Sequence, residues 1–330
     1  MPRIDVSKKT LDVSIQINDK HSYLGNFSND KKGISALIRE MKSQGLSPKE
    51  TLVCMEHTGI YTHLLLDILY NKQWQIWLAQ AVDIKKSLGN QRGKNDKVDA
   101  SRITEYAQRF QDKAVLWQPP RKEIIKLRHL VALRARFKKV RKMLNVPVKE
   151  LGKLCGDEVI KYNNHVIKSL DAQIKEVEKK IEKLIEDDAH LRSMHEIVTS
   201  VDGVGKVTSG QILVHTNEFK DFDSAKKFAC YSGRHPGGVV PFDFSSGSSI
   251  RSKPRVSHQA NKKMKELLHL SALSATVMKG ELNDYYNRKV AEEKNKMLVL
   301  NNIRNKLIHR IFKCVKENRK YEKIYTAIVV

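Results

Sequence analysis

The sequence predicts an α/β domain followed by two largely helical regions, and three observations support this prediction. Short strand-like segments alternate with amphipathic helical segments in the first hundred residues. Two long heptad repeats then flank Pro147, and beyond residue 196 glycine-rich turns separate further helical segments. At 330 residues the chain is long enough for more than one domain. We therefore predict domains over residues 1–120, 121–195 and 196–330.

The N-terminal region carries the pattern of a mixed sheet. Leu11, Val13, Ile15 and Ile17 alternate with polar residues, which is typical of a half-buried strand. The segment before it predicts a hairpin that contains Asp5. The expected elements that follow are a strand at 23–27, a helix at 32–44, a strand at 52–55 ending at Glu56, a helix at 64–69 and a strand at 75–79. This order favours a nuclease-type mixed sheet over a dinucleotide-binding fold, because no GxGxxG follows any strand.

The charge of the chain points to a polyanionic partner. Its 61 Lys and Arg residues against 37 Asp and Glu give a net charge of +24. Basic proteins gain affinity for nucleic acids by releasing the counterions of the phosphates, so nucleic acid is favoured over a membrane surface or a merely basic soluble protein. A 40% hydrophobic content excludes a disordered chain.

Other sequence features exclude several classes of protein. No apolar run reaches the roughly 18 to 20 residues of a membrane span, and the N-terminus lacks the apolar region of a signal peptide. Four cysteines without a CxxC pair indicate neither a disulfide framework nor a structural zinc site. The sequence therefore predicts a cytoplasmic protein.

Two helices with heptad patterns are expected in the middle of the chain. Residues 121–150 contain eleven basic and two acidic residues, with apolar positions at Leu130, Leu133, Phe137, Val140 and Leu144. After a break at Pro147, a second series runs through Ile167, Leu170, Ile174, Val177, Ile181 and Leu184 until Asp188. This pattern fits an antiparallel hairpin, an oligomerising coiled coil or a bundle face within one chain. The candidate nucleic-acid contacts on the first helix are Arg134, Arg136, Lys138 and Lys139.

Four acids of the N-terminal domain are candidate metal ligands: Asp5, Glu56, Asp96 and Asp99. The i,i+3 spacing of the last two places both carboxylates on one face of a helix. Neighbouring strands of a sheet could bring Asp5 and Glu56 together. Carboxylate clusters suit Mg²⁺ or Mn²⁺, which assist phosphoryl transfer. The basic residues beside the second pair are candidate phosphate contacts, namely Arg92, Lys94 and Arg102.

A glycine-containing turn lies between two expected helices, one ending near Ile197 and the next beginning near Lys206. Gly203, Gly205 and Lys206 resemble a helix-hairpin-helix turn, in which backbone N–H groups approach a phosphate. A nucleotide-binding P-loop is excluded, because Val207 follows Lys206 where that motif requires Ser or Thr.

A serine-rich loop from Phe244 to Ser252 precedes the last helices. Such a loop is either a linker or the carrier of a serine nucleophile. For the second, Gly247 would give steric access, and basic neighbours such as Arg251 and Arg255 would stabilise charge on a DNA phosphate.

Together these motifs resemble the DEDD transposases of the insertion-sequence-110 family, the RNA-guided bridge recombinases. The match spans nearly the whole chain in the order of the family. The segments that carry the resemblance are IDVSKKTLDV at 4–13, EHTGIY at 56–61, DKVDA at 96–100, VDGVG at 201–205, FACYSG at 228–233 and SGSSIR at 246–251.

The resemblance implies a RuvC-like domain with an RNase H-type fold, a coiled-coil segment and a mostly helical transposase domain. It implies that Asp5, Glu56, Asp96 and Asp99 bind Mg²⁺ (or Mn²⁺), and that Ser246, directly preceded by Ser245, forms a covalent 5′-phosphoserine with DNA. It further implies a non-coding bridge RNA that pairs with donor and target DNA. The subunits would form a tetramer, a dimer of dimers, in a prokaryotic, nucleoid-associated setting. The alternatives are a RuvC-like junction nuclease that uses water and a non-catalytic RNA- or DNA-binding scaffold.

Overall fold

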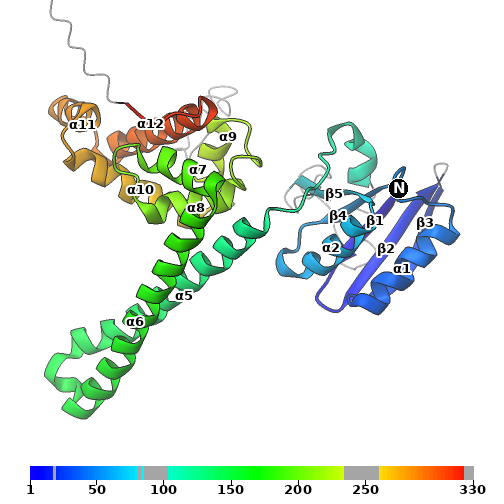
Figure 1. Cartoon of the computed structure of the whole chain (residues 1–330), viewed down its shortest axis with the longest axis horizontal. Coiled ribbons are helices and arrows are strands. Elements are labelled where there is room, and N and C mark those ends of the chain that lie inside the picture. The colour runs from blue at the N-terminus through cyan, green and yellow to red at the C-terminus, as the bar shows by residue number, and fades with distance from the viewer. Residues whose placement is uncertain (18–19, 80–82, 85–102, 104, 234–259, 323–330) are drawn as a thin grey trace, which may run out of the picture. The chain divides into compact units, whose positions relative to one another are not determined.

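The computed structural model of the chain divides into two compact units, Met1–Pro119 and Pro120–Val330 (Figure 1). It describes residues 1–17, 20–79, 83–84, 103, 105–233 and 260–322. The division into three domains stays a prediction. Among the described residues, no helix has the length and apolar character needed to cross a membrane.

The first unit contains a five-stranded mixed sheet with the predicted order of strands and helices. The strands and helices are β1 (Pro2–Val6), β2 (Thr10–Ile17), β3 (Lys20–Ser28), α1 (Lys31–Ser43), β4 (Leu52–Glu56), α2 (His63–Asn71) and β5 (Gln75–Ala79). The strand order is β3-β2-β1-β4-β5. β1 pairs antiparallel with β2 and parallel with β4, so β1 is the strand at which the direction of pairing changes.

Different helical segments pack against the two faces of this sheet. Ile4, Val13 and Met55 lie on one face and form a core with the apolar sides of α1 and α2 (Figure 1). Asp30 caps α1 by accepting a hydrogen bond from Gly33 N, which lowers the pKa of its carboxyl. On the other face, Trp77 packs with Tyr106 of the helical residues 105–109. The acidic positions of β1 and β4 lie on this second face.

Within the described residues, the regular elements of the second unit are all helices. Its helices are α5 (Lys122–Leu151), α6 (Asp157–Asp187), α7 (Ala189–Thr199), α8 (Lys206–Thr216), α9 (Ala225–Tyr231), α10 (Lys262–Val277), α11 (Glu281–Ala291) and α12 (Lys296–Lys316). α5 and α6 form an antiparallel hairpin within the chain, joined by a short 3-10 turn, Gly152–Cys155 (Figure 1). The remaining helices share one core that runs from Val198 to Ile311.

The predicted helix break at Pro147 is wrong, because α5 continues through Pro147 to Leu151. Proline has no N–H to donate to the carbonyl of residue 143, and the helix continues for one further turn without this bond. The chain turns instead at Gly152, whose φ of +53° lies in the left-handed region that favours glycine.

The heptad series of α6 is confirmed as an inward-facing surface, while that of α5 is offset from the buried stripe. Ile167, Ile174 and Val177 of α6 are buried. The buried residues of α5 are Ile124, Leu127 and Val131, and the predicted Val140 is 43% exposed. Arg134 and Arg141 continue this stripe at helical spacing, so counting apolar residues alone placed the seam on a neighbouring face.

Candidate active site and nucleic-acid interface

A row of polar side chains crosses the sheet of the first unit. Asp12 of β2 lies directly opposite Asp5 of β1 and also opposite Asn26 of β3. On the other side of β1, Ile4 is in register with Met55 of β4, so the next residues along these parallel strands are Asp5 and Glu56. Side chains at paired positions share one face of a sheet. Three carboxylates on adjacent strands therefore point to the same side.

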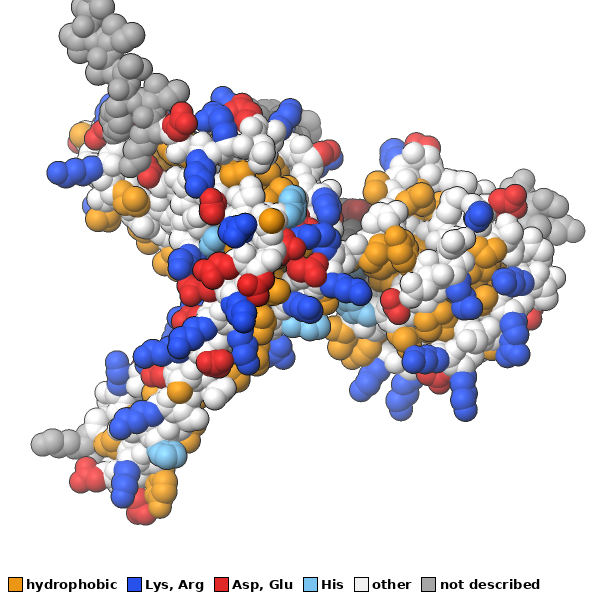
Figure 2. All heavy atoms as spheres, in the orientation of Figure 1, with side chains coloured by type: hydrophobic (Ala, Val, Ile, Leu, Met, Phe, Trp, Pro, Cys, Tyr) orange, Lys and Arg blue, Asp and Glu red, His pale blue; other side chains and the backbone are white. Residues whose placement is uncertain are grey.

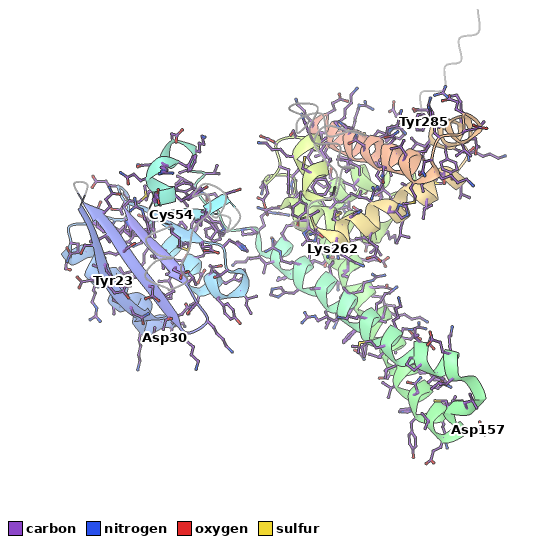
Figure 3. All side chains as sticks on the ribbon, turned by 180° about the vertical axis from the view of Figure 1, so that it is seen from behind. Tyr23, Asp30, Cys54, Asp157, Lys262 and Tyr285 are labelled. Carbon is purple, nitrogen blue, oxygen red and sulfur yellow. The ribbon has the colours of Figure 1, made fainter. Side chains whose placement is uncertain are left out.

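The acid in this row that the sequence analysis did not select, Asp12, is held by neighbouring donors. The hydroxyl of Tyr23, labelled in Figure 3, donates to Oδ1 of Asp12 at 2.7 Å, and Nδ2 of Asn26 donates to Oδ2 at 2.9 Å. Asp12 is 7% exposed, so these bonds compensate for its burial. We interpret Asp12 as a structural acid. The sequence signal that could have identified Asp12 is its position in the LDV segment that follows Asp5.

Asp5 and Glu56 are half-buried and fit the requirements of a hard divalent cation. Asp5 is the penultimate residue of β1 and Glu56 the last residue of β4, so the two carboxylates meet where parallel strands end at one edge. Like charges on neighbouring strands repel each other, and a cation relieves the repulsion. Asp96 and Asp99 lie outside the described residues, as do Arg92, Lys94 and Arg102. Within the described residues no group of three or more potential metal ligands assembles.

The predicted nucleic-acid contacts on α5 fall into two groups. Arg134 donates from Nε to Glu178 of α6 at 2.7 Å, and its side chain is only 15% exposed. Arg136, Lys138 and Lys139 are exposed on the hairpin. Figure 2 shows Lys and Arg side chains along the hairpin of α5 and α6, interspersed with acidic side chains. The three exposed residues can reach a phosphate, whereas Arg134 serves the contact between the two helices.

The glycine turn at 201–205 connects α7 to α8 as expected, and its two glycines differ in role. Gly203 has a φ of +82°, and a Cβ there would lie 2.3 Å from the backbone oxygen of Ser271 in α10. Gly203 is therefore required for helix packing. Gly205, the N-cap of α8, has open space around it. Lys206 donates to Glu182 of α6 at 2.8 Å, which raises the pKa of the lysine. The open backbone at Gly205 is the part of this turn that can approach a phosphate.

The segment that carries Ser246, Arg251 and Arg255 lies outside the described residues, but both of its ends are described. Gly233 follows α9, and residue 260 precedes α10. Asn261 N donates to the backbone oxygen of Tyr231 at 2.8 Å, so the chain returns close to the point from which it leaves.

Burial lowers the pKa values of several histidines in the second unit. His195 lines a groove of about 550 Å³ between α5, α6, α7 and α8, with its Nδ1 2.9 Å from the hydroxyl of Ser209. Burial, and secondly the charge of Lys206, lowers the pKa of His195 below its usual 6.5. Burial also lowers the pKa values of His215 and His269. Protonating these side chains is therefore harder in the folded than in the unfolded state.

We expect stability to fall as the pH is lowered from about 7 to about 5. Below its ordinary pKa each of these histidines binds protons more readily in the unfolded chain, so acid favours unfolding. Urea titrations at pH 7.5 and 5.5 measure this loss, and His195→Gln should reduce it. His165→Gln, on the exposed face of α6, is the matched control. Equal losses in His195→Gln and the parent would contradict the assignment.

The geometry of the first unit defines the class of protein. A sheet ordered β3-β2-β1-β4-β5, with acids at the carboxyl ends of the adjacent parallel strands β1 and β4, is that of a RuvC-like, RNase H-type domain. Residues 4–149 match a DEDD transposase model, and residues 195–287 match the model described as the transposase IS116/IS110/IS902 family. The chain belongs to the IS110 family of transposases, which are enzymes of DNA recombination.

Two relatives match along almost their entire length. They are the pilin gene-inverting proteins of Moraxella bovis and Moraxella lacunata. Each is 23% identical to this chain over 324 residues, which is 97% of both sequences. The similarity therefore includes both units of the structure.

Proposed function

We propose that this transposase cuts and rejoins DNA with a serine nucleophile and a divalent cation. The observation that carries the proposal is the placement of Asp5 beside Glu56 at the carboxyl ends of two parallel strands. These acids, with Asp96 and Asp99, would hold Mg²⁺ or Mn²⁺. The cation would stabilise negative charge on the DNA phosphate. The exposed α5 residues and the α8 N-terminus would bind the phosphates on either side.

The nucleophile in this proposal is Ser246. Its Oγ forms a bond to the phosphorus, the bond from phosphorus to the 3′ oxygen breaks, and the hydroxyl proton ends on that leaving oxygen. The product is a 5′-phosphoserine and a free 3′-hydroxyl. Rejoining reverses these steps with a different 3′-hydroxyl, so the bond energy is conserved without a nucleotide cofactor.

Trapping the covalent product tests the proposal. The protein is incubated with Mg²⁺, its co-purified RNA and a supercoiled plasmid carrying the DNA that flanks its gene, then denatured and digested for mass spectrometry. We expect a phosphodeoxynucleotide on Ser246. A phosphodeoxynucleotide found on Ser245 would identify Ser245 as the nucleophile in place of Ser246. Broken DNA without any protein adduct would favour the junction nuclease that uses water.

The guide in this proposal is a bridge RNA that pairs with donor and target DNA. Base pairing would supply sequence recognition, so the protein needs only backbone contacts such as those of Lys138 and Lys139. Sequencing the RNA that co-purifies identifies the guide, and digestion of that RNA should abolish recombination. Recombination that persists after complete digestion would contradict RNA guidance.

Inversion of a DNA segment is a second candidate outcome of the same chemistry. The end-to-end similarity to proteins named for inverting a pilin gene favours it. A plasmid with two inverted copies of the flanking site distinguishes the two outcomes, because inversion flips the intervening segment whereas transposition moves the element to new DNA.

Assembly into a tetramer requires a surface other than the predicted heptad seam, because Ile174 is buried against α5 within one chain. The far end of the hairpin exposes large apolar side chains, with Leu154 90% and Tyr162 67% exposed. Exposed apolar side chains that lie together are typical of surfaces that bind other proteins. We expect Leu154→Asp with Tyr162→Asp to lower the mass measured by light scattering, while Lys168→Asp on the exposed surface of α6 leaves it unchanged. An unchanged mass in the double variant would exclude this end as the interface.

A further inference from the structure

Two hydrogen bonds join the ends of the segment that carries the candidate nucleophile. The N–H of Asn261 donates to the backbone oxygen of Tyr231 at 2.8 Å. The side-chain Nδ2 of Asn261 also donates to the phenol oxygen of Tyr231 at 2.7 Å. Tyr231 is the last residue of α9, and Asn261 directly precedes Lys262, the first residue of α10, which is labelled in Figure 3. Backbone and side chain therefore hold the same pair of residues together.

A third residue completes this contact. The phenol oxygen of Tyr231 lies 2.8 Å from Nδ1 of His215, in the last turn of α8. Because the phenol oxygen already accepts from Asn261, its own proton is available for Nδ1. The bond in this direction requires an imidazole that is neutral and carries no proton on Nδ1. Burial, followed by the charge of Arg128 on α5, lowers the pKa of His215, which favours this neutral form.

Packing fixes the side chain of Tyr231, and a helix cap fixes that of Asn261. The ring of Tyr231 packs against Phe222, with centroids 5.2 Å apart, and against Phe228 at 6.0 Å. Oδ1 of Asn261 accepts from Met264 N at 2.9 Å and caps α10. Met264 itself is fully buried. The hydrogen bonds between the segment ends are thus supported by packed helices on both sides.

We propose that Tyr231, Asn261 and His215 are positioning residues that set the two ends of the segment bearing Ser246, so that its hydroxyl meets the DNA phosphate. This inference rests on the proposed serine chemistry. A nucleophile on a chain segment reacts efficiently only when few conformations compete with the reactive one, and a displacement of about 1 Å can cost about 100-fold in rate. Fixing both ends at one point removes much of that freedom.

Two substitutions remove the side-chain hydrogen bond from Asn261 to Tyr231 and leave the backbone bond and the packing in place. Tyr231→Phe keeps the ring and deletes the hydroxyl. Asn261→Asp keeps an oxygen to cap α10 and deletes the donor to Tyr231. We expect each to lower the maximal rate of adduct formation on the plasmid about 10- to 100-fold. The DNA concentration at half-maximal rate should stay within about 2-fold and the melting temperature within about 4 °C.

Tyr286→Phe is the matched control, because it deletes a hydroxyl from another tyrosine that packs against the same core. It should form the adduct at the parent rate. A parent-like rate in Tyr231→Phe would overturn the positioning role. A rate loss explained entirely by weaker DNA binding or by partial unfolding would also overturn it.

Trypsin digestion separates failure of this inference from failure of the serine chemistry. The segment contains Arg251 and Arg255 as cleavage sites. We expect cleavage there to be at least about 3-fold faster in Tyr231→Phe than in Tyr286→Phe, whether or not any adduct forms. If even the parent forms no adduct, the proposed function fails, and the digestion then decides whether these residues anchor the segment. Equal cleavage rates would overturn the anchoring.

Discussion

Asp5→Asn is expected to lower the rate of DNA cleavage at least about 1,000-fold while leaving the fold intact. The substitution keeps the shape of the side chain and removes its charge, and loss of charge stabilisation worth about 4 kcal/mol gives this factor. Stability should change little, because asparagine fills the same space and Asp5 is only half-buried. A single-turnover cleavage assay and a thermal melt measure the two effects.

Asp12→Asn is the matched control in the same row. Asp12 accepts hydrogen bonds from Tyr23 and Asn26, and an asparagine can accept only one of them without rearrangement. We expect this variant to lose about 1 to 3 kcal/mol of stability and to keep cleavage within about 5-fold of the parent. If Asp5→Asn loses cleavage and Asp12→Asn loses only stability, Asp5 acts in catalysis and Asp12 supports the fold. Full cleavage by Asp5→Asn would remove Asp5 from the metal ligands.

The sheet and its acids could be predicted from the sequence because their signals are local. Strand periodicity at Leu11 and Val13 fixes which side chains face the core, and a short apolar run ending at Glu56 fixes a buried strand. Once β1 and β4 are neighbours, Asp5 and Glu56 have to lie close together. The order of strands in the sheet follows from contacts between distant segments, and the family pattern supplied that information.

The roles of Gly203 and Arg134 could not be predicted, because both depend on a partner helix. A glycine in a turn is compatible with phosphate binding or with close packing, and only the approach of Ser271 shows the second. A basic residue on a basic helix is compatible with nucleic-acid binding, and Glu178 lies 44 residues further along the chain. In both cases the decisive contact has no local sequence signal.

The turn after α8 is a further feature without a local signal. Asn217, Glu218 and Phe219 have φ values of +49°, +58° and +63°, three successive residues in a region that non-glycine residues rarely adopt. Hydrogen bonds within the turn hold this conformation, including one from Phe219 N to the hydroxyl of Thr216 at 3.0 Å. Strained backbone persists where its surroundings determine it strongly. Here the strained turn delivers the carboxylate of Glu218 into the protein interior.

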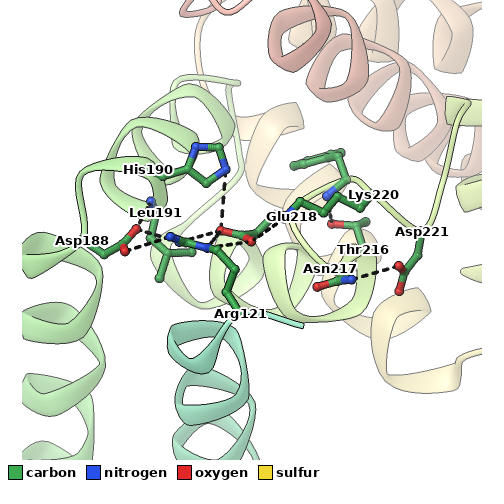
Figure 4. Close-up of polar contacts among 10 residues, drawn as sticks. Arg121, Asp188, His190, Leu191, Thr216, Asn217, Glu218, Lys220 and Asp221 are labelled. Atoms are coloured by element: carbon green, nitrogen blue, oxygen red, sulfur yellow. Dashed lines mark hydrogen bonds and ion pairs between the residues drawn. The ribbon is translucent and has the colours of Figure 1, made fainter. Parts of the chain in front are cut away.

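A buried ion network receives that carboxylate (Figure 4). The side chain of Glu218 is 0% exposed and accepts from Nη2 of Arg121 at 2.8 Å. Arg121 also donates to Asp188, the N-cap of α7, at 2.8 Å. Hydrogen bonds to Asp188 and then Glu218 raise the pKa of Arg121, and the same contact lowers that of Asp188. Arg121, the N-cap of α5, thus ties the start of that helix to α7 and to the strained turn.

Arg121→Met should lower the stability of the second unit by about 2 to 4 kcal/mol, because it leaves a buried carboxylate without its main partner. The estimate is at the lower end of the range for buried pairs, since Arg121 is 33% exposed and Lys220 remains 3.4 Å from Glu218. All three tryptophans, Trp74, Trp77 and Trp117, belong to the first unit. The midpoint of the denaturation curve measured by circular dichroism should therefore fall. The midpoint measured by tryptophan fluorescence should stay the same.

Adding Glu218→Gln to Arg121→Met identifies the cause of that loss. If the cost comes from an uncompensated buried charge, neutralising Glu218 restores part of the stability, and the double variant is more stable than Arg121→Met alone. If the cost comes from lost side-chain packing, the two losses add. Arg319→Met is a matched control, because it removes an exposed arginine whose partner, Glu317, is also exposed, and exposed pairs contribute little. A loss as large in Arg319→Met as in Arg121→Met would show that burial of Glu218 is not the cause.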